Sequence, residues 1–435
     1  MIPAPVLETP AWAICLSSVL LVPLAMAGLA LINNGLGRAR SAAHAMLASL
    51  CVISVAFIVY VVLGFSWAGF AGGPAHLWIL GGKPWNWIAA EPFFLRGVEL
   101  DGSPASLSAL LQMFGAGLAA LIPLSAATDR WRLGASCAST AVLAGCTYPI
   151  FAHWVWDGGW LAQLGINYGL GEGFIDTGGA ASIQVVAGLT ALALVWILGP
   201  RRDKYSSEGT PAAIPGHNLV FVIFGCFVAW LGWLGLNSAG AILFHHAQPG
   251  SVVLVVVNTT LSAAVSGLTA VTITRIRFGR PDASISANGW IGGLVASSAA
   301  SAFFRPAASL LIGFVAGILV TFAVDWFEMW LTVDDPGGAI SVHTVAGLWG
   351  LLAVGLFAHL PGQISANRQW VAQLIGIATL LGFVLPLTYA LNWLLDRLYP
   401  QRVDPDGERQ GMDLYELGAG AYPEFVIHTD EFIQR

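Results

Sequence analysis

Two polar residues occupy matching positions in two similar segments of this sequence. Residues 176–192 read DTGGAASIQVVAGLTAL and residues 335–351 read DPGGAISVHTVAGLWGL, so 10 of 17 positions are identical. Gln184 in the first copy corresponds to His343 in the second. An imidazole can gain and lose a proton, whereas an amide donates and accepts hydrogen bonds without titrating. The repeat therefore pairs one titratable and one non-titratable group.

The composition indicates a membrane protein. Of 435 residues, 57% are hydrophobic and only 10% are charged, whereas about a quarter are charged in soluble proteins. The five cysteines lie in apolar stretches without CxxC or Cys/His spacing, so the sequence predicts neither a metal site nor disulfide bonds. The net charge of -6 comes without a basic patch, which argues against nucleic acid as a partner.

Uncharged stretches predict eleven membrane-spanning helices. A helix needs about 20 apolar residues to cross roughly 30 Å of hydrocarbon. Such stretches lie near residues 11–33, 42–67, 104–128, 134–156, 176–199, 217–238, 250–274, 283–303, 307–331, 339–359 and 369–396. We therefore expect an all-α membrane domain over residues 1–397, an external loop at 68–103 and a polar cytoplasmic tail at 398–435.

The basic residues predict the orientation of the chain. No lysine or arginine precedes the first predicted helix, and Arg38 and Arg40 follow it, so the positive-inside rule places the N-terminus outside and the C-terminus inside. Most other basic residues then fall on the cytoplasmic side. The exceptions are Lys83, Arg96, Arg305 and Arg368.

The repeat predicts an inverted architecture. The two copies begin the fifth and tenth predicted helices, and an offset of five places the second copy in the opposite direction. We expect two inverted five-helix repeats, at about 11–199 and 217–359, and one final helix. Such folds bind substrate near the membrane midplane, where the halves meet.

Each copy begins with an aspartate, Asp176 or Asp335, that is suited to cap a helix N-terminus. Eight residues later, about 12 Å along the helix, come Gln184 and His343, close to the midplane from opposite sides. We therefore expect these two side chains to meet in a shared lumen. The alternative is two separate buried polar residues that are satisfied locally.

Ordered motifs along nearly the whole chain resemble the ammonium transporter family (Amt/Mep/Rh). They are ATDRWRL, TYPIFAHWVWDGGWLAQLG, GHNLVFVIFG, WLGWLGLNSAG, DDPGGAISVHTVAG and GERQGMDLYELGAGAY. The resemblance implies a transporter, not an enzyme, without a cofactor. It further implies nitrogen uptake, as ammonium or ammonia, through a narrow hydrophobic channel in each protomer of a homotrimer. We expect a bacterial inner membrane or an equivalent bilayer.

The resemblance also assigns roles to three residues of this chain. Trp156 falls on the tryptophan of an external site, where an aromatic face can hold a cation. Asp176 matches the aspartate that supports this site, and His343 matches the second of two paired pore histidines.

Other positions depart from the family pattern. Gln184 replaces the first pore histidine, and Leu236 replaces one gate phenylalanine. The other gate position aligns with Gly115, although Phe114 is adjacent. The remaining departures lie around the external site: Leu111 for an aromatic residue, Gly240 for a serine and Asp157 for a common glycine. Because an amide cannot relay a proton, and because small gate residues widen a lumen, we expect altered proton transfer and weaker selectivity over potassium.

The tail carries part of a regulatory sequence. Gly411, Asp413 and Tyr422 match a motif that in the family docks against the neighbouring protomer, and a PII-type signal protein plugs the pore from this side in many bacteria. Leu417 and Ala419 depart from that motif, so subunit contact is expected more than PII control.

Two other functions stay open: a poorly conducting ammonium sensor, and a pore for potassium, methylamine or a neutral gas.

Overall fold

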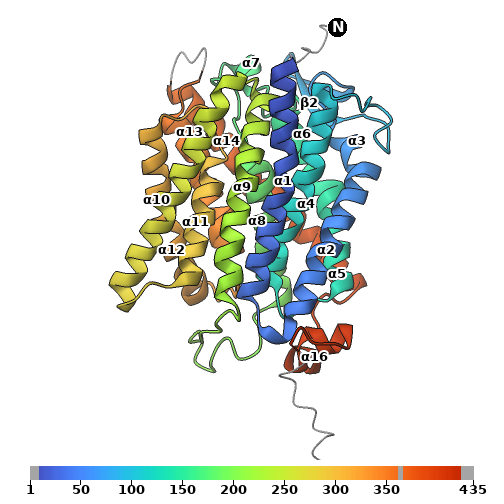
Figure 1. Cartoon of the computed structure of the whole chain (residues 1–435). Helices are drawn as coiled ribbons and strands as arrows, with labels where there is room; N and C mark the ends of the chain where they lie inside the picture. The colour runs from blue at the N-terminus through green and yellow to red at the C-terminus, as the bar shows by residue number, and fades with distance from the viewer. Residues whose placement is uncertain (1–8, 361–365, 423–435) are drawn as a thin grey trace, which may run out of the picture.

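The protein forms a bundle of long helices in the computed structural model, which describes residues 9–360 and 366–422 (Figure 1). A β-hairpin lies toward one end of the bundle, which we call the hairpin end. The C-terminal segment packs at the opposite end, which we call the tail end. The first half contains α1 (Thr9–Leu36), α2 (Ala42–Val59), α3 (Phe65–Ala68), α4 (Pro104–Ala127), α5 (Leu133–Val142), α6 (Tyr148–Trp156), α7 (Leu164–Tyr168) and α8 (Val186–Leu198). The second half contains α9 (Leu219–His245), α10 (Val252–Phe278), α11 (Ala283–Ser297), α12 (Pro306–Trp330), α13 (Ala346–Phe357), α14 (Ala366–Thr379), α15 (Leu385–Leu398) and α16 (Pro405–Gln410).

Ten helical segments within the described residues are long and apolar enough to cross a membrane. Several combine two helices through a π-helical turn, as α5 and α6 do over Leu133–Trp156. The helix predicted at 283–303 is shorter than expected, because α11 spans only 15 residues before the chain turns. At 1.5 Å per residue α11 covers about 22 Å, so its length alone does not identify it as a membrane span. It packs against α10, α12 and α13.

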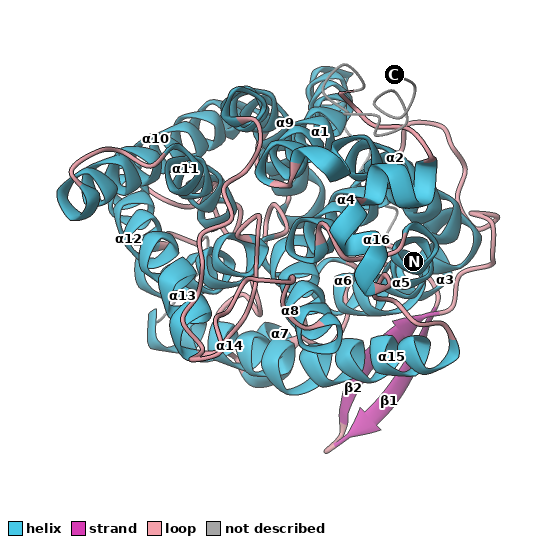
Figure 2. Ribbon diagram, turned by 90° about the horizontal axis from the view of Figure 1, so that it is seen from below, coloured by secondary structure: helices cyan, strands magenta, loops and turns pink. Residues whose placement is uncertain are grey.

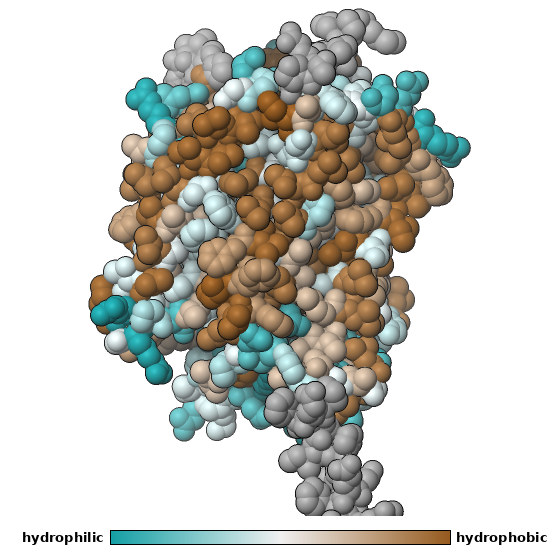
Figure 3. Space-filling view, in the orientation of Figure 1, coloured by the Kyte–Doolittle hydropathy of each residue, from teal (hydrophilic) through white to brown (hydrophobic). Residues whose placement is uncertain are grey.

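The surface is suited to a bilayer. Figure 3 shows apolar side chains over the middle of one face, with hydrophilic residues gathered toward the two ends. Large apolar residues such as Leu50, Ile58, Val220 and Leu268 are more than 60% exposed. Exposed apolar area on this scale would be unstable in water. The chain is therefore a multi-pass membrane protein.

Both repeat copies fold in the same way. Each has a glycine at positive φ, Gly179 (88°) or Gly338 (72°), followed by a π-helical turn, Ala180–Val185 or Ile340–Val345. The α-helices α8 and α13 then continue. Glycine is needed at these two positions because L side chains rarely adopt positive φ. Gln184 and His343 both lie in the π-helical turns, which are frequent at functional sites.

The segment predicted as a loop at 68–103 contains a two-stranded antiparallel sheet. Strands β1 (Ala75–Leu80) and β2 (Lys83–Ala89) are joined by Gly81 and Gly82, both at positive φ. This pair of glycines is typical of a tight hairpin turn, a signal that the loop prediction overlooked. Figure 2 shows the hairpin projecting sideways beyond α15.

Candidate functional site

Gln184 and His343 are in direct contact in the buried interior of the bundle. The Nδ1 atom of His343 lies 2.7 Å from the Oε1 atom of Gln184, and both side chains are buried. The contact joins the π-helical turns of the two repeat copies. With the amide in this orientation Oε1 accepts the hydrogen bond, so a neutral imidazole carries its proton on Nδ1 and the Nε2 atom of His343 keeps its lone pair.

The amide nitrogen of Gln184 has no hydrogen-bond partner among the described residues. A buried donor without a partner costs about 1–3 kcal/mol, so such a group needs an explanation. Together the pair offers a donor on Gln184 and an acceptor on His343. This combination suits a small molecule that both donates and accepts hydrogen bonds.

Small residues bring the two copies together. A Cβ atom added to Gly188 would overlap Thr344 of the second copy, and one added to Gly347 would lie 2.6 Å from Val185 of the first. The two glycines occupy equivalent repeat positions. Close backbone approach therefore depends on the same feature in both halves.

The two repeat aspartates cap the π-helical turns. Asp176 accepts hydrogen bonds from the backbone N–H groups of Gly179, Ala181 and Ser182 and from the Ser182 hydroxyl, at 2.8–3.0 Å. Asp335 accepts two backbone hydrogen bonds, at 2.9 and 2.7 Å. Burial raises the pKa of each carboxyl to about 6, although the N–H donors act in the opposite direction.

Trp156 is tied to the first copy. Its Nε1–H donates to the backbone oxygen of Asp176 at 2.6 Å, so the tryptophan predicted for the external site and its supporting aspartate are linked. The Phe244 ring stacks on Trp156 with centroids 4.3 Å apart and planes 4° apart. Phe244 was not predicted, although it lies one helical turn after Gly240 on α9.

A cavity of about 100 Å³ adjoins this aromatic pair at the hairpin end. Ser108, Trp156, Asp157, Phe244 and His246 contribute to its lining. We call it the hairpin-end cavity. Its lining is largely apolar and includes one acidic residue, Asp157.

Asp157 is almost fully buried and depends on Gln112. The Nε2 atom of Gln112 donates to both carboxylate oxygens of Asp157, at 3.1 and 3.0 Å. Burial raises the pKa of Asp157 well above its usual range, and the Gln112 hydrogen bond only partly offsets this. Gln112 was not predicted, but a single amide in the middle of an apolar helix was a usable signal.

The candidate gate positions differ in their surroundings. Phe114 packs on α2, with its ring 5.8 Å from that of Phe57. A Cβ atom at the adjacent Gly115 would lie 2.5 Å from the Tyr148 hydroxyl and 3.2 Å from Ile183 of the first repeat copy. Gly115 rather than Phe114 therefore faces the repeat, and Tyr148 occupies the space beside it.

The remaining departures around the gate and the external site are buried. Leu236 and Leu111 are 1% and 2% exposed. A side chain at Gly240 would overlap the backbone oxygen of Thr177, so this backbone leaves no room for a serine there.

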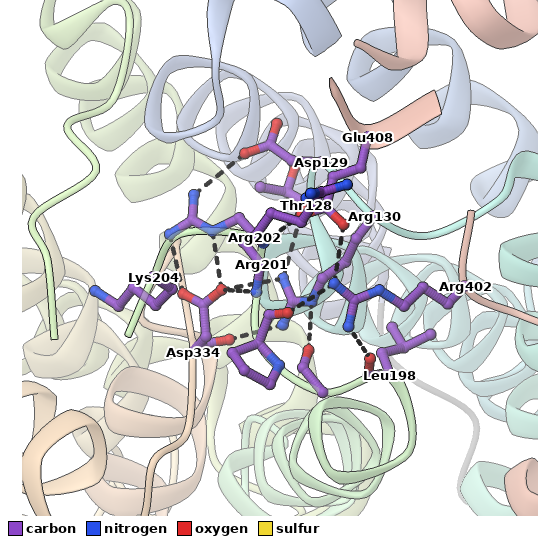
Figure 4. A network of polar contacts seen from close by, with 12 residues as sticks. Thr128, Asp129, Arg130, Leu198, Arg201, Arg202, Lys204, Asp334, Arg402 and Glu408 are labelled. Atoms are coloured by element: carbon purple, nitrogen blue, oxygen red, sulfur yellow. Dashed lines mark hydrogen bonds and ion pairs between the residues drawn. The ribbon is translucent and has the colours of Figure 1, made fainter. Parts of the chain in front are cut away.

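A buried ion network lies at the tail end (Figure 4). The guanidinium group of Arg201 contacts both carboxylate oxygens of Asp334, at 2.9 and 3.0 Å, and reaches Asp129 at 3.2 Å. Arg130 donates to the Asp334 backbone oxygen at 2.8 Å. Burial alone would raise the pKa of Asp334, but Arg130 and Arg201 outweigh it and lower the pKa to about 2. The network fixes the residue directly before the cap Asp335.

The C-terminal segment docks on this end of its own chain. Asp413 accepts hydrogen bonds from the backbone N–H groups of Ala43 and His44, at 3.1 and 2.7 Å, where α2 begins. Glu416 contacts the His44 ring at 2.8 Å and accepts from the Leu133 N–H. The other two predicted tail residues also make contacts: Tyr422 lies 3.0 Å from His217, and Gly411 packs against Arg40.

The chain matches the model of the Ammonium Transporter Family over residues 11–422. Ammonium transporter Amt2 of Archaeoglobus fulgidus is 34% identical over 427 residues, covering 94% of this chain and 88% of that protein. The ammonium transporter of Bacillus subtilis is 30% identical over 414 residues, covering 93% and 96%. Among solved structures, a sensor Amt protein has a TM-score of 0.84 at 28% identity, covering 93% and 98%. Mep2 of Candida albicans has a TM-score of 0.77 at 24% identity, covering 96% and 91%.

Proposed function

This chain belongs to the ammonium transporter family and transports ammonium, and we propose that it does so by passing neutral ammonia between Gln184 and His343. The observation that carries this mechanism is the contact between the two repeat copies. Ammonia has one lone pair and three N–H groups. It can accept from the Gln184 amide and donate to the Nε2 atom of His343.

Passage of the neutral species follows from the cost of dehydration. An isolated cation in an apolar lumen loses its water shell at a cost of many kcal/mol, and the Gln184–His343 pair supplies no negative charge. The proton is therefore left on the entry side. Because Gln184 does not titrate, a relay from one imidazole to another is not available here.

The entry site would consist of Trp156 and Asp176, with cation-π attraction from the indole ring. Gly115 and Leu236 would form the gate region between this site and the central pair, and Phe114 would support the wall from α2. These roles are consistent with the Trp156–Asp176 hydrogen bond and with the position of Gly115 beside Ile183.

The topology completes the proposal. We count α11 as an eleventh transmembrane helix, because it joins two long helices and packs within the bundle. The N-terminus then lies outside and the tail inside, in two inverted five-helix repeats plus a last helix. The membrane domain is 1–397 and the tail 398–435, in a homotrimer of the bacterial inner membrane. Subunit contact through the tail is favoured over binding of a PII-type protein.

Ammonium and potassium pulses on proteoliposomes test the transport mechanism. With the purified protein reconstituted, internal pH and current are recorded together. Entry of neutral ammonia raises the pH inside the vesicles with little current, whereas entry of the ammonium ion carries charge. Equal currents for ammonium and potassium would overturn the proposal in favour of an unselective pore.

A sensing function is the second candidate, and one observation favours it. A protein named as a sensor has a TM-score of 0.84 and 28% identity to this chain. A sensor would bind ammonium near Trp156 yet produce neither alkalinisation nor current. Calorimetric binding without flux would therefore select the sensor.

A further inference from the structure

The carboxylate of Asp157 accepts its two side-chain hydrogen bonds from a single nitrogen, whereas Asp176 and Asp334 have several donors. Asp176 accepts four hydrogen bonds, and Asp334 is paired with arginines. Asp157 is 2% exposed, and among the described residues its carboxylate is held only by the neutral amide of Gln112. A buried carboxylate without a cationic partner is costly, so a cation in contact with it would be strongly favoured.

The Gln112 side chain cannot move to serve as a better partner. Its Oε1 atom accepts from the Tyr60 hydroxyl at 3.1 Å, and its Nε2 atom donates to Ser108 at 3.1 Å as well as to Asp157. Every polar atom of this amide is therefore engaged. It orients the Asp157 carboxylate but brings no charge to it.

The helix that carries Asp157 adds to the negative potential. Asp157 is the C-cap residue of α6, which continues the helical segment that begins at Leu133. The C-terminal end of a helix carries a partial negative charge, which disfavours a carboxylate and favours a cation. Asp157 also lines the hairpin-end cavity. The position is unfavourable for folding and favourable for a bound cation.

The aromatic part of this site is reduced. Phe244 covers one face of Trp156, which removes that face from contact with a cation. Gly240 carries no hydroxyl, and Leu111 carries no ring. A charged side chain that contacts the cation would compensate for these lost contacts.

We propose that Asp157 is a substrate-binding residue whose carboxylate pairs with the ammonium cation in the hairpin-end cavity, beside Trp156. This inference rests on the proposed transport function. The cavity of about 100 Å³ has room for an ammonium cation and about two waters, since a water takes up about 30 Å³ in the liquid. The contact would set affinity, while passage between Gln184 and His343 would set the maximal rate.

The test is the substitution Asp157→Asn, which keeps an oxygen that can accept from Gln112. Ammonium chloride is titrated by calorimetry against solubilised protein, and concentration-dependent alkalinisation is recorded in proteoliposomes. We expect the dissociation constant and the half-saturating concentration to rise at least tenfold, with the maximal rate kept within twofold. Asp157→Glu should recover part of the affinity. The matched control is Asp101→Asn, which removes an exposed carboxylate at the same end.

The outcomes separate the two proposals. Absence of flux in the unmodified protein overturns transport, while the binding titration still tests Asp157. An unchanged dissociation constant in Asp157→Asn overturns the inference even if flux is normal. A folded Asp157→Asn protein that binds normally but has lost its maximal rate also overturns it, because it would place Asp157 in translocation. An equal loss of affinity in Asp101→Asn would assign the effect to general surface charge.

Discussion

The Nδ1 atom of His343 lies 2.7 Å from the Oε1 atom of Gln184, and with this oxygen facing the ring a neutral imidazole carries its proton on Nδ1. The Nε2 atom of His343 is left as an acceptor, and the Gln184 amide nitrogen as a donor without a partner among the described side chains. The pair can therefore guide a neutral molecule. It cannot pass a proton from one side chain to the other, because the amide does not titrate.

Gln184→His should create a proton path at the centre of the bundle. Two imidazoles in contact can share and relay a proton, so ammonium pulses should evoke several times more current relative to alkalinisation than in the unmodified protein. Current and internal pH in proteoliposomes measure this ratio. Gln184→Leu is the control, since it removes the hydrogen bond without adding a titratable group. An unchanged ratio in Gln184→His would refute the role assigned to the amide.

The repeat explains why this pair was predictable. Both residues lie eight positions after the aspartate of their repeat copy, so they are equivalent. Because the copies are five predicted helices apart, they run in opposite directions, which predicts that the two side chains meet. Most helix positions also follow from hydropathy, since the span predicted at 104–128 is Pro104–Ala127 in the structure. Hydropathy is calculated for each segment by itself, without knowledge of its neighbours. It therefore predicts the positions of long apolar helices well.

Contacts between distant polar residues were not predictable in this way. Arg201 and Asp334 are 133 positions apart, and neither belongs to a repeat that would match them. The Phe244 stack on Trp156 likewise depends on how α9 is rotated against α6. Such contacts depend on tertiary packing, and no periodic pattern in a single sequence predicts them.

Phe114→Ala should weaken folding without changing selectivity, because Phe114 packs on Phe57 of α2. Loss of this partly buried ring should cost about 1–3 kcal/mol, less than the 3–5 kcal/mol of a fully buried phenylalanine. Thermal unfolding in detergent measures the change, and ammonium and potassium currents measure selectivity. Phe57→Ala should have a similar effect, with non-additive losses in the double variant. A shift in the current ratio would instead place Phe114 at the gate.

Asp176→Asn should destabilise the protein more than Asp335→Asn. Asp176 accepts four hydrogen bonds and Asp335 two, and asparagine replaces one accepting oxygen with a donor that faces N–H groups. Each buried donor left unpaired costs about 1–3 kcal/mol. Unfolding midpoints of the two variants give the comparison. Equal midpoints would show that the number of capping bonds is unimportant here.

Asp413→Ala should release the C-terminal segment from α2. The substitution removes both acceptors for the N–H groups of Ala43 and His44, a capping loss of about 1 kcal/mol. Trypsin should then cleave after Arg409 several times faster, which a digestion time course can follow. Asp406→Ala is the control, because it removes only an exposed ion pair with Arg409. Equal cleavage rates in both variants would contradict the capping role.

Acidification should reduce the folding stability that the buried ion network provides. The pKa of Asp334 is lowered from 3.8 to about 2 in the folded protein, where burial is outweighed by Arg130 and Arg201. A carboxyl whose folded pKa is depressed contributes stability above its unfolded pKa and loses it as pH falls through the folded value. A shift of nearly two units corresponds to about 2.5 kcal/mol. Stability should therefore fall by most of this amount between pH 4 and pH 2.

Two other carboxyls act in a different pH window. Burial raises the pKa of Asp176 and Asp335 to about 6, so the folded state binds more protons than the unfolded state between about pH 6 and pH 4. In that window they stabilise the fold as pH falls, and below it their contribution is constant.

A substitution of Asp334 tests whether this residue causes the loss of stability between pH 4 and pH 2. Asp334→Asn should be less stable at neutral pH by about 3–5 kcal/mol, because two buried arginines lose a partner, and should show a flatter acid decline. A decline as steep as in the unmodified protein would attribute the acid sensitivity to other carboxyls.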